Sequence, residues 1–520
     1  MAKRLRIAAA TGVLLTCVWT SFGANCSECH KLPLTGDDLA AWRSPTGGWN
    51  VVQDATLAPG NEKLLTTQPG KGAIVNGPTG KTVNLLSKKE FGDVRVHIEF
   101  LVSKDSNSGV YFMGRYEVQV FDSWQKTSDY PGIECGGIYQ RWDESRRPQG
   151  FEGHSPRVNA SKAPGQWQSF DVVFRAPRFD KTGRKIANAR FEKVAHNGVL
   201  VHRDVVLTGP TRAGAYDDEK PLGPLMLQGD HGPVAYRNLW LAPAGPNPFF
   251  AMDTATQDPN HKTAGQQAQM LKELGYAGIG PGYTGVGPLT EMLKELDARD
   301  LQLFALYTGV NIDPGAQPYD PSLKDAMKIL DGHNTILWIF AQSKEHGPST
   351  MEGDARAVEI LRELADAAAS HNVRLSLYPH HSFWMETIED TVRIAGKVNR
   401  PNVGVTFNLC HWLRVGPSRD AKTAIENAMP YLSMVNINGA DSDGKDWKTL
   451  IQTLDRGTFD VRGFLEILRD AGYTGPIGFQ GYGIGGDARD NLQRTMAAWE
   501  KHSQVLRGDV AVFGEPRKAP

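Results

Sequence analysis

The first half of the chain alternates apolar and polar residues in short runs, and Gly, Asn, Asp and Pro separate these runs. A period of two is the pattern that a half-buried β-strand produces. The clearest runs are "DVRVHIEFLV", "SGVYFM", "YEVQVFD", "WQSFDVVFRA", "PLMLQG" and "YRNLWLAP". Many short strands between frequent turns predict an all-β sandwich or jelly roll over residues 34–243.

The pattern changes after "PAGPNP", a hinge rich in Pro and Gly at residues 243–248. Short apolar runs such as "FFAMD", "TILWIFAQ" and "IGFQGYG" now alternate with helical patterns such as "LTEMLKELDARD" and "ARAVEILRELADAAAS". Eight such pairs over about 240 residues predict a closed (β/α)8 TIM barrel at residues 249–505, followed by a tail at 506–520. An open doubly wound sheet is the alternative, but no Gly-rich phosphate loop supports it.

The balance of charges argues against partners that are bound through bulk electrostatic attraction. The chain has 520 residues, of which 57 are basic and 58 acidic, so it has no net field that would attract nucleic acid or an anionic membrane. The length exceeds what one hydrophobic core supports, which agrees with a chain of several domains.

The N-terminus has the three regions of a secretory signal peptide in order: basic "MAKRLR", apolar "IAAATGVLLTCVW" and small-residue "SFGA". Cleavage after Gly23 or Ala24 would remove residues 1–24, so we expect a chain exported to the periplasm or outside the cell. An uncleaved anchor is the alternative, but the apolar run is short for a bilayer. No later segment has the pattern of a transmembrane helix.

The segment "CSECH" has the spacing of a c-type haem attachment, with Cys26 and Cys29 as thioether positions and His30 as axial ligand. A haem needs a packed helical envelope, and only a short polar stretch precedes the first strands. A local disulfide or two free thiols is therefore favoured over haem.

Polar residues in "YEVQVFD" are candidates for sugar chemistry. Glu117 and Gln119 are two residues apart, so they project from the same face of a strand, and the apolar residues between them form the other face. Asp122 adds a second carboxylate at the strand end. A solvated surface carboxylate is the alternative for Glu117, but the opposite face already supplies the core.

Four further candidate residues stand in turns or near them. The segment "GDHG" places Asp230 and His231 in a turn before the last strand, from which Arg237 could reach inward. Asn107 in "SNSG" is explained equally well as a turn former and as a sugar ligand.

The stretches "LTGDDLAAW", "DSNSGVYFMGRYEVQVFDS", "GGIYQRW" and "LQGDHGPVAYRNLWL" resemble the 3-keto-disaccharide hydrolase family, which has a concanavalin-like jelly roll. The resemblance covers nearly the whole first half. It implies Glu117 or Asp122 as the base and His231 as the group that protonates the leaving oxygen or stabilises an enolate. The residues expected to bind sugar in these stretches are Asn107, Gln119, Tyr139 and Arg237.

A 3-keto sugar permits cleavage without an oxocarbenium ion. The ketone acidifies the C2 proton, so a base can remove it, the C1 substituent leaves, and water then adds to the 2-hydroxy-glycal. Such a site needs a base, a donor for the enolate oxygen and an acid for the leaving group. Oxidation to the 3-keto sugar would require a separate oxidoreductase as partner, because the sequence has no nucleotide-binding fingerprint.

Polar residues also follow the apolar runs of the second half, where the active groups of such barrels lie. They are Tyr378, His380, His381, Asn408, His411, Asn436, Asn438, Asp441, Gln480 and Tyr482. Nearly all are neutral hydrogen-bonding groups. This half resembles the xylose-isomerase-like sugar isomerase and epimerase barrels. The features that carry the resemblance are the alternation of strands and helices and the segment "VGVTFNLCHWL".

That resemblance implies a divalent metal held by side chains on strands five to eight, and the matching positions are Tyr378, Asn408, Asn438 and Gln480. None is a carboxylate, so we expect no metal at the usual site, and we expect these residues, with His380 and His411, to bind sugar instead. Chance decay of the site stays open as an explanation. So does a weak nitrogen site formed by His380, His381 and His411.

The sequence therefore predicts an exported enzyme that cleaves 3-keto-glycosides or 3-keto-disaccharides in the sandwich, by elimination and hydration. The barrel would bind or further process the sugar. The alternative is a non-catalytic sugar-binding protein, in which a lectin-like sandwich is fused to an inactivated barrel.

Overall fold

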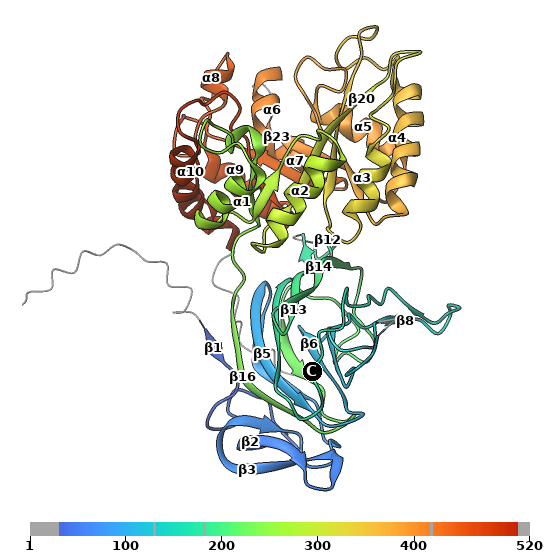
Figure 1. Ribbon diagram of the computed structural model, residues 1–520, viewed down its shortest axis with the longest axis vertical. Coiled ribbons are helices and arrows are strands. Elements are labelled where there is room, and N and C mark those ends of the chain that lie inside the picture. The colour runs from blue at the N-terminus through green and yellow to red at the C-terminus, as the bar shows by residue number, and fades with distance from the viewer. Residues whose placement is uncertain (1–30, 128–131, 181, 417–419, 508–520) are drawn as a thin grey trace, which may run out of the picture.

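The computed structural model describes residues 31–127, 132–180, 182–416 and 420–507. The expected signal peptide and the "CSECH" segment lie outside these residues, as does most of the expected tail. The chain forms an all-β part and a ring of alternating strands and helices, which follow one another through a single connection (Figure 1). Within the described ranges no helix is long and apolar enough to cross a bilayer.

Two antiparallel sheets make up the all-β part. The large sheet contains, in spatial order, β14 (Val199–Leu207), β13 (Ala189–His196), β10 (Gln168–Arg175), β5 (Val94–Val102), β16 (Val234–Pro243), β3 (Asn61–Val75) and β2 (Asn50–Ala58), and β1 (Leu32–Pro33) pairs with β16. The small sheet contains β4 (Leu85–Phe91), β15 (Gly223–Leu227), β6 (Asn107–Phe112) and β7 (Tyr116–Phe121). Two short ribbons are formed by β8 (Arg141–Trp142) with β9 (Gly150–Phe151) and by β11 (Arg178–Phe179) with β12 (Lys185–Ala187).

The core of this part lies between the two sheets. One buried cluster combines alternate residues of the large sheet, such as Ile98 and Val172, with alternate residues of the small sheet, such as Val110 and Val118. A period of two places these side chains on one face of each strand, which is why the sequence alternates. The predicted β-sandwich is confirmed.

The second half forms one parallel sheet that curls into a barrel. Its strands are, in spatial order, β19 (Gln302–Leu303), β18 (Gly278–Gly280), β17 (Phe249–Met252), β25 (Ile477–Phe479), β24 (Leu432–Ile437), β23 (Val403–Asn408), β22 (Arg374–Leu377), β21 (Ile336–Gln342) and β20 (Ala305–Asn311). β19 and β20 are two parts of one strand that is interrupted at Phe304. A parallel bridge between Gly282 and Tyr307 connects the ends of the sheet, so the predicted TIM barrel is confirmed.

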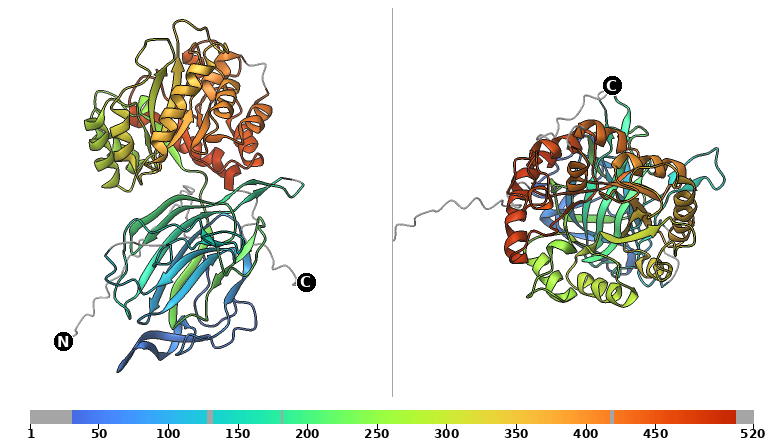
Figure 2. Two further views of the ribbon diagram at one scale, coloured as in Figure 1. Left: turned by 90° about the vertical axis from the view of Figure 1, so that its right-hand side faces the viewer. Right: turned by 90° about the horizontal axis from the view of Figure 1, so that it is seen from above.

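Helices surround this barrel. They are α1 (Ala264–Glu273), α2 (Val286–Asp297), α3 (Leu323–Leu330), α4 (Asp354–Ala369), α5 (Ile388–Val398), α7 (Ala421–Ala428), α9 (Val461–Asp470) and α10 (Ala488–His502), with the short helices α6 (Leu409–Val415) and α8 (Trp447–Leu450) after β23 and β24. Thr263 and Thr387 start α1 and α5 with capping boxes, in which the Thr side chain accepts the N–H of the third helical residue. The ring of helices is clearest from above (Figure 2).

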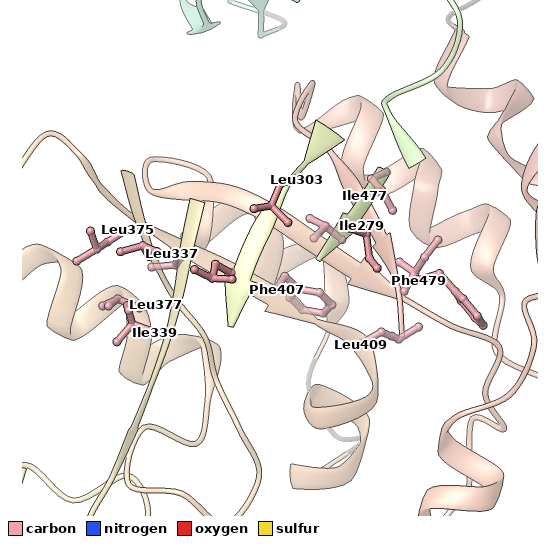
Figure 3. Packing of buried hydrophobic residues seen from close by; sticks show 14 of the residues in the cluster. Ile279, Leu303, Leu337, Ile339, Leu375, Leu377, Phe407, Leu409, Ile477 and Phe479 are labelled. Atoms are coloured by element: carbon pink, nitrogen blue, oxygen red, sulfur yellow. The ribbon is translucent and has the colours of Figure 1, made fainter. Parts of the chain in front are cut away.

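The barrel strands are apolar on both faces because both faces are buried. Figure 3 shows outward residues such as Ile279, Leu337 and Phe407, which belong to the large cluster between strands and helices. Inward residues at the N-terminal ends of the strands, such as Phe250 and Trp338, form a second cluster that fills the barrel floor. Polar groups can therefore line the interior only above that floor, near the C-terminal ends.

The sandwich packs against the N-terminal ends of the barrel strands. At the centre of this contact Asp204 of β14 pairs with Arg190 at 2.8 Å and with Arg374, the first residue of β22, at 2.9 Å. Asn334, just before β21, donates to the same carboxylate at 3.0 Å. Lys193 of β13 adds a contact to Asp300 at 2.7 Å. The C-terminal ends of the barrel strands therefore face away from the sandwich (Figures 1 and 2).

Candidate functional site

The outer face of the small sheet carries polar side chains on β6 and β7. The register places Tyr111 opposite Glu117 and Gly109 opposite Gln119. Directly opposed residues of antiparallel strands point to the same face, and the alternate residue Val118 belongs to the sandwich core. Glu117, Gln119 and Tyr111 thus lie together on the face that points away from the core.

Glu117 is a buried carboxyl group with an exposed fraction of 2%. Its Oε2 has no hydrogen-bond partner among the described residues, while the Tyr111 hydroxyl donates to the carboxyl group. Gly109 makes room for it, because a Cβ there would lie 2.1 Å from Glu117 Oε1. Burial raises the pKa of Glu117 to about 8, against the opposing effect of the Tyr111 hydrogen bond. Glu117 therefore carries a proton at neutral pH.

Glu117→Gln is expected to stabilise the fold at pH 9 and to change its stability little at pH 4. The Glu carboxyl has an ordinary pKa of 4.5 and a folded pKa of about 8, so between these values the folded state holds a proton that the unfolded state has lost. The free energy of unfolding of the wild type therefore falls as pH rises through this window, by an amount on the order of a few kcal/mol, and the neutral Gln removes that loss. Melting temperatures of both proteins at pH 4, 6 and 9 measure it. Equal pH slopes for the two proteins would contradict the buried neutral carboxyl.

Three of the predicted sugar-binding residues lie beside Glu117. Gln119 Nε2 donates to Asn107 Oδ1 at 2.9 Å, so these two carboxamides are held as a pair. The backbone N–H of Tyr139 donates to the carbonyl oxygen of Glu117 at 3.2 Å. Together they provide neutral hydrogen-bonding groups next to the protonated carboxyl.

Asp230 and His231 form the turn that leads into β16, at the end of the sandwich away from the barrel. Asp230 Oδ1 lies 2.5 Å from His231 Nδ1, and a carboxylate only accepts, so Nδ1 carries a hydrogen and the lone pair of the neutral ring is on Nε2. The turn packs against β6, because a Cβ on Gly232 would lie 3.0 Å from the backbone nitrogen of Asn107. Burial is the main cause of the raised pKa of Tyr111, and the charge of Asp230 contributes to it. The pair is therefore within electrostatic reach of the carboxyl site.

Two predicted residues have other surroundings. Asp122 Oδ2 accepts the N–H of Asp105 at 3.0 Å, so this carboxylate holds the preceding turn. Arg237 does not reach inward: its neighbour Tyr236 faces the sandwich core, and Arg237 itself pairs with Glu99 at 2.6 Å on the outer face of the large sheet. The two sheets therefore separate Arg237 from the carboxyl site.

A second candidate site lies at the mouth of the barrel. The C-terminal strand ends surround a cavity of about 420 Å³, a size typical of small-molecule sites. Its walls include the predicted residues Tyr378, His380, His411 and Gln480, together with Asp253 and Trp447.

Hydrogen bonds hold the polar groups of the mouth in place. The side-chain amides of Asn408 and Asn436 both donate to the Tyr378 hydroxyl oxygen. On the other side of the ring the Thr254 hydroxyl donates to Gln480 Oε1 at 2.7 Å. Since these contacts use lone pairs of the phenol oxygen, the Tyr378 hydrogen is available to a ligand.

The two histidines of the mouth have opposite tautomers. His380 Nδ1 lies 2.9 Å from the carbonyl oxygen of His381, so it carries the hydrogen. The backbone N–H of His381 donates to His411 Nδ1 at 3.3 Å, so in His411 the hydrogen is on Nε2. Burial, reinforced by the neighbouring histidines, holds the pKa of His411 far below its usual value. Neutral His380 thus offers an acceptor and neutral His411 a donor.

Two family models cover most of the described chain. Residues 32–242 match the 3-keto-alpha-glucoside-1,2-lyase-like domain of the 3-keto-disaccharide hydrolases, and residues 268–502 match the xylose isomerase-like TIM barrel. The two matches fall on the two parts of the chain and agree with the fusion predicted from the sequence.

Several solved structures match one part of the chain each. A candidate glycosyl hydrolase from Parabacteroides distasonis is 27% identical over 41% of this chain and 83% of its own, with a TM-score of 0.29. A 3-keto-D-glucoside 4-epimerase from E. coli is 17% identical over 49% of this chain and 99% of its own, with a TM-score of 0.41. A D-allulose 3-epimerase from Methylomonas sp. is 16% identical over 50% and 98%, also with a TM-score of 0.41. No curated protein matches the chain.

The divalent metal implied for xylose-isomerase-like barrels does not fit the residues of this barrel. Asn408 Oδ1 already accepts the N–H of His411 and the thiol of Cys410, and Asn438 Nδ2 donates to a backbone carbonyl oxygen at 2.7 Å. Hard cations need anionic oxygen ligands, whereas Tyr378, Asn408, Asn438 and Gln480 are neutral. The described part of the chain holds no group of three His, Cys, Asp or Glu side chains arranged for a metal.

We expect the barrel of the full-length protein to contain no stoichiometric divalent ion at this site, because none of the four side chains there is a carboxylate that would compensate the loss of the ion's water shell. Metal analysis of the dialysed full-length protein, before and after incubation with Mn²⁺ or Mg²⁺, measures it. Asn408→Ala serves as the comparison. A stoichiometric ion that is bound by the wild type and lost in this variant would contradict the expectation.

Asp253 and Tyr111 have the clearest chemical role among the site residues that were not predicted from the sequence. Asp253 directly follows β17, so the Asp of "FFAMD" was a visible signal: a carboxylate immediately after an apolar strand. Tyr111 gave no such signal, because its position opposite Glu117 depends on the register of β6 and β7. Aromatic residues in strands usually belong to the core.

Proposed function

We propose that the sandwich cleaves 3-keto-glycosides or 3-keto-disaccharides by elimination across C1 and C2, and that hydration completes a net hydrolysis. The observation that carries this proposal is Glu117. It is a protonated, buried carboxyl with one unpartnered oxygen, beside the Tyr111 hydroxyl, in a domain that matches a 3-keto-glucoside-lyase-like family. Buried carboxyl groups with raised pKa values are typical of proton-transferring sites.

The geometry favours an exchange of the roles expected from the sequence. His231, whose Nε2 keeps its lone pair, takes the C2 proton as base. The electrons of the C2–H bond form the C1–C2 double bond, and the C1–O bond breaks. Glu117, which holds a proton at neutral pH, gives it to the leaving oxygen, and Tyr111 keeps the carboxyl oriented.

The barrel then binds the released sugar or processes it further. This role of the barrel is supported by its cavity of about 420 Å³. The neutral donors and acceptors in the cavity wall suit the hydroxyl groups of a sugar. The 3-keto substrate itself would come from a separate oxidoreductase.

The decisive experiment incubates the full-length protein with a 3-keto-glucoside and follows release of the aglycone and of the keto sugar. Turnover above the buffer rate supports the enzyme. Saturable binding without turnover supports the rival proposal, a sugar-binding protein with an inactivated barrel. A 3-keto-galactoside in parallel measures how strictly the site selects the sugar.

We also propose that the chain is exported, because a basic, an apolar and a small-residue region follow one another at its start, as in a secretory signal peptide. The protein recovered from an exported fraction is expected to begin near residue 24 or 25. N-terminal sequencing measures this. An exported protein that still begins at Met1 would contradict cleavage.

A further inference from the structure

The walls of the barrel cavity select for a neutral ligand. Among the residues that the structure describes, none that lines the cavity is Lys or Arg, so these walls offer no cation for a phosphorylated or carboxylated sugar. Tyr307, Trp447 and Tyr482 give it aromatic surfaces, which suit the C–H faces of a sugar ring. The cavity is therefore built for a neutral molecule of sugar size.

Asp253 is the one carboxylate among the described residues that line the cavity. Its Oδ2 accepts the backbone N–H of Gly282 at 2.8 Å, and the backbone N–H of Thr254 also donates to the carboxylate. Burial raises the pKa of Asp253 above its ordinary value, although these two hydrogen bonds oppose the shift. A carboxylate that is fixed by backbone donors and desolvated by its surroundings is a stronger base than one in water.

Donors for a developing oxyanion lie in the same cavity. The Tyr378 oxygen accepts from Asn408 and Asn436, which leaves its hydrogen for a ligand. His411 carries its hydrogen on Nε2. Two neutral donors can stabilise an enolate oxygen without a metal ion.

We propose that the barrel mouth is a second catalytic site, in which Asp253 moves a proton at a carbon next to the carbonyl of a neutral keto sugar without a metal ion. The choice of a 3-keto sugar as substrate rests on the function proposed for the sandwich. The Asp253 carboxylate takes the proton, the electrons of the C–H bond form a carbon–carbon double bond, and the carbonyl oxygen becomes an enolate held by Tyr378 and His411. Return of a proton from Asp253 to the same carbon completes the cycle, so no oxidant or reductant is needed.

Deuterium exchange tests this directly. Full-length protein that has been treated with EDTA is mixed with 3-keto-D-glucose in D₂O, and NMR follows the proton signal at C4, the carbon beside the ketone that the reaction proposed for the sandwich does not deprotonate. The wild type is expected to exchange this proton well above the buffer rate. Asp253→Asn should lower the rate by at least about a hundredfold, and Tyr378→Phe by at least about tenfold. Melting curves and calorimetric titration with the same sugar verify that each variant folds and binds.

The matched control is Asp441→Asn, since Asp441 follows β24 at the same end of the barrel but is absent from the residues that line the cavity. It should exchange at the wild-type rate. A wild type that exchanges but does not cleave 3-keto-glucosides would refute the function of the sandwich and leave this inference standing.

Three results would overturn the inference. The first is a wild type that exchanges no faster than buffer. The second is an unchanged rate in Asp253→Asn or Tyr378→Phe. The third is exchange that EDTA abolishes and Mn²⁺ or Mg²⁺ restores, which is measured on the wild type and so does not depend on the folding of any variant.

Discussion

Glu117→Gln is expected to lower the rate of 3-keto-glycoside cleavage by at least about a hundredfold, and toward ten-thousandfold if proton donation limits the step. Gln keeps the shape of the side chain and can still accept from Tyr111, but it has no proton to transfer. Aglycone release under saturating and limiting substrate separates the effects on kcat and KM. The loss should be in kcat, because the proton moves only in the transition state.

Glu99→Gln is the matched control, because it makes the same change in the same domain. Glu99 lies on the outer face of the large sheet, where it pairs with Arg237, and this variant should cleave at the wild-type rate. Full activity of Glu117→Gln, or equal losses in both variants, would place the chemistry elsewhere.

The largest stability effect is expected at the contact between the domains. Asp204→Asn should lower the free energy of urea unfolding at pH 7 by at least about 2 kcal/mol, because it leaves Arg190 and Arg374 without their buried counter-charge. Asp204 has a φ of 54°, a conformation that Asn adopts readily, so the change removes charge without straining the backbone.

Acid should produce the same effect in the wild type. Burial alone would raise the pKa of Asp204, but Arg190 and Arg374 hold it below its ordinary value of 3.8. The folded state thus keeps the carboxylate charged where the unfolded chain has begun to bind a proton. The stabilisation is complete above that ordinary value and is lost as pH falls through the lowered folded pKa.

The control for this contact is Asp300→Asn, which breaks the ion pair with Lys193 at the same interface. Both of its side chains are more than one-third exposed, so the expected loss is below about 1 kcal/mol. An Asp204→Asn protein as stable as the wild type would show that the contact contributes little.

The architecture was predictable because burial imposes a period on each strand. The alternation in "YEVQVFD" follows from a sheet with one face on the core, and the continuous apolar run in "TILWIFAQ" follows from a strand buried on both faces. The position of Asn408 at the end of β23 was equally accessible, since a polar residue that closes an apolar strand lies at the barrel mouth.

What the sequence did not disclose depends on contacts between distant segments. The pKa of Glu117 is raised because other parts of the chain bury its carboxyl group. Arg237 pairs with Glu99 because the register of β16 and β5 places the two residues opposite each other. The position of Asp253 after an apolar strand was visible in the sequence, but its hydrogen bond from the backbone N–H of Gly282 was not. Side-chain roles that depend on such long-range contacts require the structure.

The position of the sandwich against the N-terminal ends of the barrel strands affects how a sugar could pass from one domain to the other. Phe250 and Trp338 fill the barrel floor above the charged contact, and the turn of Asp230 and His231 lies at the opposite end of the molecule from the barrel mouth. This packed floor separates the two, so under the proposed function a sugar released by the sandwich would diffuse through bulk solution before the barrel captured it. The tether would raise the local concentration, but capture would compete with escape, and a second enzyme nearby could intercept the same molecule. Under that function the fusion would bring two sites close together without a sealed channel between them.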